Sequence, residues 1–158
     1  MTTAHIAELG FSGTIHKKGA EMFKKGVILG VILALFMANA VATQAKTIEY
    51  EEQELLARVV EAEAGNQGII GKRLVVAVIY NRVESEKFPN TVYDVLTSPH
   101  QFSTVWNGQV EKMEITPETL FAIEIERSHR SDNEILYFNN GKCSGKYAYT
   151  YKGHQFGK

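Results

Sequence analysis

Cysteine is nearly absent from this chain of 158 residues: Cys143 is the single one, so an intramolecular disulfide is excluded. It lies in a Gly-Lys-Cys-Ser-Gly turn with no activating residue beside it. A catalytic thiol would need a base, for which His154 is available, but a lone cysteine is more often a packing residue. We therefore expect Cys143 to be buried or a free thiol, not a nucleophile.

The chain also lacks a strong charge of either sign. Its 17 Lys and Arg and 18 Asp and Glu give a formal net charge of -1. Nucleic-acid-binding proteins usually carry a basic stripe, so we expect no nucleic-acid partner. The five histidines show no metal-ligand spacing, and we expect neither a metal nor a cofactor. The length and the 44% hydrophobic content predict one globular domain.

One apolar run, Val27 to Ala38, follows a segment with four lysines and precedes several A-x-A sites. This order is typical of a signal peptide, and the run is short for a transmembrane helix. A short buried core helix is the alternative. We divide the chain into a leader, residues 1–45, and a domain, residues 46–158. Translation from Met22 would give a compact leader; otherwise residues 1–21 form a cytoplasmic tail of an uncleaved anchor. We expect an exported protein that contacts the membrane only through this leader, if it is retained.

The stretch from Leu55 to Val83 organises the domain. Leu56, Val59, Val60 and Glu63 have the i, i+3, i+4, i+7 spacing of one helix face, so the Glu63 carboxyl extends an apolar stripe. Glu63 is also in the last turn of the predicted helix. Burial and the carbonyl end of the helix dipole both disfavour a negative charge, as a general acid requires. The alternative is a boundary residue whose carboxyl turns out to water.

The opposite side of this helix carries Glu54, Arg58 and Glu61. Glu54 and Arg58 are one turn apart, which predicts an i, i+4 ion pair. We interpret the three residues as a solvated charge face. Substitution of Glu61 is therefore expected to cost little.

A series of blocks extends from about Glu54 to Phe156: Ala57, Arg58, Val60, Glu63, Ala64, Gly71, Leu74 to Tyr80, Asn81-Arg82-Val83, Phe88-Pro89-Asn90-Thr91, Gln101-Phe102-Ser103, Leu136-Tyr137-Phe138 and Gly153-His154-Gln155-Phe156. In the order and spacing of these blocks, the chain resembles the cell-wall hydrolase family of the spore cortex-lytic enzymes SleB and CwlJ. The family's first block is roughly A-R-x-V-x-x-E-A-R-G-E, followed by a glycine and an apolar run ending in N-R-V. Two departures occur, because Gly65 replaces the family's Arg and Gln67 its second Glu.

The resemblance implies a lysozyme-like α+β fold, with a helical core, a small C-terminal antiparallel sheet and the catalytic Glu at a helix end. It also implies lytic transglycosylation of peptidoglycan glycan strands between N-acetylmuramic acid and N-acetylglucosamine. Glu63 would be the acid and base. We expect the enzyme to act as a monomer.

Further elements follow from local signals. A central helix is expected over about residues 70–86, and Thr91 can cap a short helix over 92–96. Thr116 and Pro117 are expected to begin a helix that ends at about residue 128. Its packing face would consist of Leu120, Phe121, Ile123 and Ile125. Strands are expected over residues 134–138 and 147–151, with turns at Asn140-Gly141 and Lys152-Gly153. Alternation would place Tyr147, Tyr149 and Tyr151 on one face of the sheet.

The loop from Ser98 to Gly108 collects an amide, two hydroxyls and two aromatic rings, which suits a sugar. From this loop and the resemblance we predict substrate contacts by Gln101, Ser103, Tyr137 and His154. Equally, Phe102 and Trp106 can simply anchor the loop to the core.

Two rival functions stay open at this stage. A hydrolytic muramidase needs a second carboxylate, which Glu84, Glu86 or Asp94 could supply. A wall-binding or structural protein with the same fold would not need Glu63 at all. An amidase is disfavoured because zinc ligands are not evident.

Overall fold

The computed structural model describes residues 14–158, and their side chains except those of 14–21 and 45–48. The chain divides into two compact units, Met1–Thr47 and Ile48–Lys158. The first 13 residues of the predicted leader lie outside the described residues.

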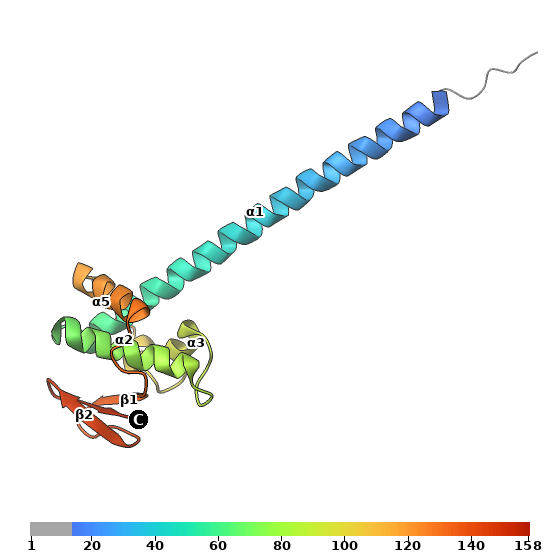
Figure 1. The fold of residues 1–158 in the computed structure, drawn as a ribbon. Helices are drawn as coiled ribbons and strands as arrows, with labels where there is room; N and C mark the ends of the chain where they lie inside the picture. Colours follow the sequence, from blue (N-terminus) through green and yellow to red (C-terminus); the bar gives the residue numbers. More distant parts are fainter. Residues whose placement is uncertain (1–13) are drawn as a thin grey trace, which may run out of the picture. The chain divides into compact units, whose positions relative to one another are not determined.

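Helix α1 spans Thr14–Ala64 and belongs partly to each unit (Figure 1). The helix continues through residues 46–50, at the predicted boundary between leader and domain, because no Gly or Pro occurs between Val31 and Ala64. Its segment from Met22 is long and apolar enough to cross a membrane, and the apolar side chains from Val27 to Val41 are exposed. These exposed side chains favour a leader over the alternative of a short buried core helix.

In the second unit, α2 (Gly68–Glu84) is the central helix and lies between α5 (Pro117–Ser128) and the sheet (Figure 1). Its side chains enter two hydrophobic clusters: Val75, Val76 and Ile79 join the first, and Leu74, Ala77 and Val78 the second. A helix that is apolar on all sides must be covered on all sides. The predicted central helix is confirmed.

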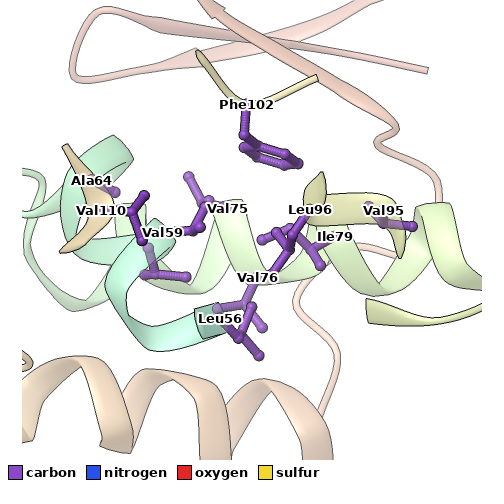
Figure 2. Packing of buried hydrophobic residues seen from close by; sticks show 11 residues of the cluster. Leu56, Val59, Ala64, Val75, Val76, Ile79, Val95, Leu96, Phe102 and Val110 are labelled. Atoms are coloured by element: carbon purple, nitrogen blue, oxygen red, sulfur yellow. The ribbon is translucent and has the colours of Figure 1, made fainter. Parts of the chain in front are cut away.

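The first cluster joins the end of α1 to α2, α3 (Val92–Thr97) and the loop that carries Phe102 (Figure 2). The Phe102 ring is 1% exposed and reaches the cluster from this loop. The loop is therefore fixed to the helical core. The other members of the cluster are Leu56, Val59, Val60, Ala64, Val95, Leu96 and Val110.

Short elements fill the segment between α2 and α5. Thr91 caps α3 as predicted, because its hydroxyl accepts a hydrogen bond from the Asp94 N–H at 3.1 Å. The segment from Ser98 to Gly108, expected to be loop throughout, contains the single-turn helix α4 (Ser103–Trp106). A 3₁₀ turn, η1 (Val110–Lys112), follows it.

Helix α5 begins at Pro117 under a Thr116 cap, as predicted, but its buried face differs from the predicted one. Leu120 and Phe121 are 55% and 59% exposed, whereas Thr119, Ala122 and Glu126 are buried. The difference arises because polar partners inside the domain satisfy the two polar residues. Glu126, for example, accepts hydrogen bonds from Arg73 at 3.0 Å and from the Ser131 N–H at 2.6 Å.

The sheet consists of β1 (Tyr137–Asn140), β2 (Tyr147–Tyr151) and β3 (His154–Gly157). The strands pair antiparallel in the order β1-β3-β2. Lys152 and Gly153 form the predicted turn between β2 and β3, with φ of 44° and 91°. The α+β prediction is confirmed.

Two details of the sheet were predicted wrongly. The first strand begins at Tyr137 instead of Glu134, because the Asp132 carboxylate accepts hydrogen bonds from the N–H groups of Glu134 and Ile135 and forms a turn there. A register shift between Tyr147 and Tyr149 interrupts the alternation in β2. Tyr149 and Tyr151 consequently pack on the second cluster, while Tyr147 is 58% exposed.

Candidate active site

Glu63 lies in the last turn of α1 and is partly buried, next to the fully buried Val59 and Val60 of the same helix. Its Oε1 accepts a hydrogen bond from the Thr104 hydroxyl at 2.7 Å. Thr104 is itself 8% exposed and belongs to α4. The carboxyl predicted to be the catalytic acid is therefore oriented by a hydrogen bond from α4.

Thr104 was not among the predicted site residues, although its hydroxyl was noted in the loop. Ser103 was chosen instead because it belongs to the Gln101-Phe102-Ser103 block that resembles the family. In α4, successive side chains point about 100° apart, so Thr104 turns to Glu63 while Ser103 stays exposed. The buried Phe102 just before them was the only signal in the sequence for this placement.

Arg82, from the family's N-R-V block, contacts Phe102, the residue just before α4. Its Nε donates to the Leu136 carbonyl at 2.7 Å, and its guanidinium lies 4.9 Å from the Phe88 ring centre and 5.3 Å from that of Phe102. Burial lowers the pKa of Arg82 to about 10, with Tyr137 acting in the opposite direction, so the group stays cationic at neutral pH. Arg82 thus joins α2 to the loop and to the start of the sheet.

Glu61 contradicts the prediction of a solvated charge face. Its side chain is only 8% exposed, and its carboxylate accepts hydrogen bonds from the Thr116 N–H at 3.0 Å, from the Thr116 hydroxyl and from the Thr119 hydroxyl at 2.5 Å. The sequence could not reveal this, because the residues that cover Glu61 come from α5, more than 50 positions away. Burial alone would raise its pKa, but the three hydrogen bonds and the nearby Lys72 outweigh burial and lower it.

Lys72 completes this buried cluster. It is 1% exposed, and its Nζ lies 3.4 Å from Glu61 and 3.0 Å from Glu118. The cluster ties the last turns of α1, which carry Glu63, to α2 and to the start of α5. Of the predicted charge face, the ion pair between Glu54 and Arg58 is confirmed at 2.7 Å.

The four predicted substrate-contact residues occupy different surroundings. Ser103 is exposed and lines a cavity of 510 Å³, and Gln101 is exposed beside it in the chain. Tyr137 is partly buried, with its ring centre 6.1 Å from that of Phe88. His154 is 8% exposed and its ring centre lies 5.8 Å from that of Phe138. Among residues 14–158, the hydrogen bonds of Glu63 include none of the four, so their roles stay predictions.

The two aromatic residues of the loop, predicted either to contact a sugar or to anchor the loop, differ in their surroundings. Phe102 is a core anchor, whereas Trp106 is 61% exposed and does not serve the core.

Cys143 is buried and free, as expected. In the part of the chain that the structure describes, no group of three or more His, Cys, Asp and Glu could hold a metal ion.

Several proteins with similar sequences are spore cortex-lytic enzymes. A spore cortex-lytic enzyme of Bacillus cereus is 35% identical over 101 residues, which cover 61% of this chain and 38% of the enzyme. That of Bacillus subtilis is 41% identical over 86 residues, covering 54% of this chain and 28% of the enzyme. The chain therefore spans well under half the length of these relatives.

Similar solved structures cover the domain more fully. The catalytic domain of Bacillus cereus SleB matches with a TM-score of 0.61 and 27% identity, over 68% of this chain and 89% of that domain. The catalytic domain of the germination-specific lytic transglycosylase SleB of Bacillus anthracis matches with a TM-score of 0.60 and 27% identity. The match covers 68% of this chain and 93% of that domain. The family model described as Cell Wall Hydrolase matches residues 66–158, a range that begins just after Glu63. The chain belongs to the cell wall hydrolase family.

Proposed function

We propose that this chain cleaves the glycan strands of peptidoglycan by lytic transglycosylation, with Glu63 as the single acid and base. The observation that carries the proposal is the placement of Glu63: a partly buried carboxyl at a helix end, oriented through Oε1 by Thr104. Its Oε2 makes no hydrogen bond to the residues described here, so it remains available to a substrate oxygen. Similarity to a lytic transglycosylase domain supports the reaction type.

The proposed reaction needs one carboxyl group. Glu63 donates its proton to the glycosidic oxygen between N-acetylmuramic acid and N-acetylglucosamine, and the bond from that oxygen to C1 of the muramyl sugar breaks. The muramyl 6-hydroxyl oxygen then bonds to C1, closing a 1,6-anhydro ring, and its proton passes to Glu63. The carboxyl is restored and no water is consumed.

A hydrolytic muramidase remains the rival chemistry, and it requires a second carboxylate near Glu63. Two of the three candidates are engaged elsewhere: Glu84 pairs with Arg130, and Asp94 accepts a hydrogen bond from the Thr91 hydroxyl at 2.7 Å. Glu86 is exposed just after the end of α2. These placements favour the single-carboxyl reaction.

The bond that is cut can be tested on purified peptidoglycan sacculi. We expect the full-length chain to release soluble muropeptides with intact stem peptides, which mass spectrometry identifies. Release of free peptides from uncut glycan would indicate an amidase and overturn the proposal. A chain that binds sacculi but releases nothing would support the wall-binding alternative.

Ser103 provides a test of the loop. We expect Ser103→Ala to lower turnover on sacculi by about three- to tenfold, the cost of one hydrogen bond to substrate, with little change in melting temperature. Ser144→Ala is the control, since Ser144 is an exposed serine in the segment before β2. Equal kinetics for the two variants would remove Ser103 from the site.

Export through the leader is part of the proposal. The exposed apolar helix from Met22 and the similarity to cell-wall enzymes support it. We expect N-terminal sequencing of the exported protein to place its first residue between Val41 and Lys46. An active exported protein that begins at Met1 or Met22 would show instead that the leader is kept as a membrane anchor.

A further inference from the structure

A cavity of 510 Å³ opens at the segment that carries Thr104 and is lined by Pro99, His100, Ser103, Trp106 and Asn107. Three of these residues lie on α4 or at its C-terminal cap, at i, i+3 and i+4 positions that share a face. The same single turn carries Thr104, whose hydroxyl contacts Glu63. A molecule bound in the cavity would therefore rest on the element that orients the proposed catalytic acid.

Trp106 is the only tryptophan of the chain and is 61% exposed at this cavity. Its indole N–H points to the Ser98 carbonyl at 3.4 Å, a long hydrogen bond that involves the ring edge and leaves the faces free. Phe102 already anchors the loop in the core. The position of Trp106 thus contributes little to the fold, although an aromatic ring of this size usually buries a large area.

The lining also restricts the charge of a ligand. None of the five residues is a Lys, Arg, Asp or Glu, so the lining offers no permanently charged partner to an anionic or a cationic group. Pro99 and Trp106 offer apolar surfaces, while Ser103, Asn107 and His100 offer hydrogen-bonding groups. This combination matches a neutral ring with C–H groups on its face and hydroxyl and amide groups on its edge.

We propose that this cavity binds an N-acetylglucosamine residue of the glycan strand, with the sugar face stacked on Trp106. The inference rests on the proposed function and specifies which sugar the site recognises. N-acetylglucosamine is neutral, whereas N-acetylmuramic acid carries a lactyl group and a stem peptide with carboxylates. Seating the neutral sugar here would fix the strand relative to Glu63 through α4.

Because Trp106 is the sole tryptophan, fluorescence excited selectively at tryptophan, and not at the seven tyrosines, reports on this cavity. The experiment uses the full-length Glu63→Gln chain, which should bind without cutting, in a zwitterionic detergent that lacks a sugar headgroup. Triacetylchitotriose is the neutral probe and N-acetylmuramyl dipeptide the anionic one. We expect chitotriose to change the emission in a saturable way, and the dipeptide to bind at least about tenfold more weakly.

Variants then test the aromatic face by calorimetry with chitotriose. Trp106→Ala should raise the Kd about tenfold or more, and Trp106→Tyr, which keeps an aromatic face, should remain within about threefold of the parent. Phe121→Ala is the matched control, because Phe121 is a 59% exposed aromatic on α5 and should leave the Kd unchanged. In the catalytically intact chain, Trp106→Ala should raise KM for sacculi more than it lowers kcat.

Three results would overturn the inference: no saturable fluorescence change with chitotriose, an unchanged Kd in Trp106→Ala, or tighter binding of the anionic probe. Binding and cleavage separate this inference from the proposed function. If the wild-type chain bound chitotriose at Trp106 but never cut sacculi, the proposed function would fail while the sugar subsite remained. If it cut sacculi but chitotriose caused no change in Trp106 fluorescence, the sugar subsite would fail while the proposed function remained.

Discussion

Glu63→Gln should abolish glycan cleavage, with a loss of at least the 10²- to 10⁴-fold that a general acid–base group typically contributes. Glutamine keeps the size of the side chain and an oxygen that can accept the Thr104 hydrogen bond, so the fold should be retained. It cannot deliver a proton to the leaving oxygen. The measurement is the rate of muropeptide release from sacculi, together with the melting temperature of the variant.

Glu54→Gln is the matched control for this experiment. Glu54 lies on the same helix and forms a partly exposed ion pair with Arg58, away from the contact with Thr104. We expect it to cut sacculi at nearly the normal rate. If Glu63→Gln also released muropeptides normally, the assignment of the catalytic acid would be wrong.

Glu61→Ala should produce the largest loss of stability among the carboxylates near the site. It would leave the Lys72 ammonium, which is 1% exposed, paired only with the partly exposed Glu118. It would also remove the acceptor for the Thr116 N–H and two hydroxyls at the start of α5. Removing one partner of a buried ion pair costs about 3–5 kcal/mol, so we expect the melting temperature to fall by about 10 °C or more.

The pH dependence of this loss has a definite sign. The pKa of Glu61 in the folded chain is lowered from its ordinary value of 4.5, so its ionised form stabilises the fold at every pH above that value. The contribution disappears as the pH falls through the lowered pKa. The difference in melting temperature between the parent chain and Glu61→Ala should therefore be constant near neutral pH and shrink in acid.

Glu54→Ala serves as the comparison for stability. Glu54 forms a partly exposed i, i+4 ion pair with Arg58, and exposed pairs of this kind contribute only about 0.3–0.5 kcal/mol. Equal melting temperatures for Glu61→Ala and Glu54→Ala would mean that Glu61 is solvated in solution. The sequence-based interpretation of a charge face would then be right after all.

Features with local signals were predictable from the sequence. Thr91 and Thr116 cap helices because a hydroxyl just before a helix can bond its first N–H groups, and the Lys152-Gly153 turn follows from two residues between alternating strands. The end of the long helix near Ala64 follows from Gly65 and the loop residues after it. The central helix was predictable because the whole segment from Ile70 to Glu86 is too long for a strand.

Features that depend on distant residues were not predictable. Glu61 and Glu126 look like surface residues on their own helices, and only the packing of α5 against α2 shows that both are buried and satisfied. For the same reason Leu120 and Phe121 were assigned to the core and are exposed. At the site, the contact of Thr104 with Glu63 was not predicted, because it depends on one helical turn that no local pattern indicated.

The reaction itself is tested most directly by digesting sacculi in water labelled with heavy oxygen and weighing the new muramyl ends. Lytic transglycosylation predicts 1,6-anhydro ends that are lighter by one water and contain no labelled oxygen, and it predicts that Glu63→Gln forms none. Reducing muramyl ends that carry the label would contradict this account and establish a hydrolytic muramidase.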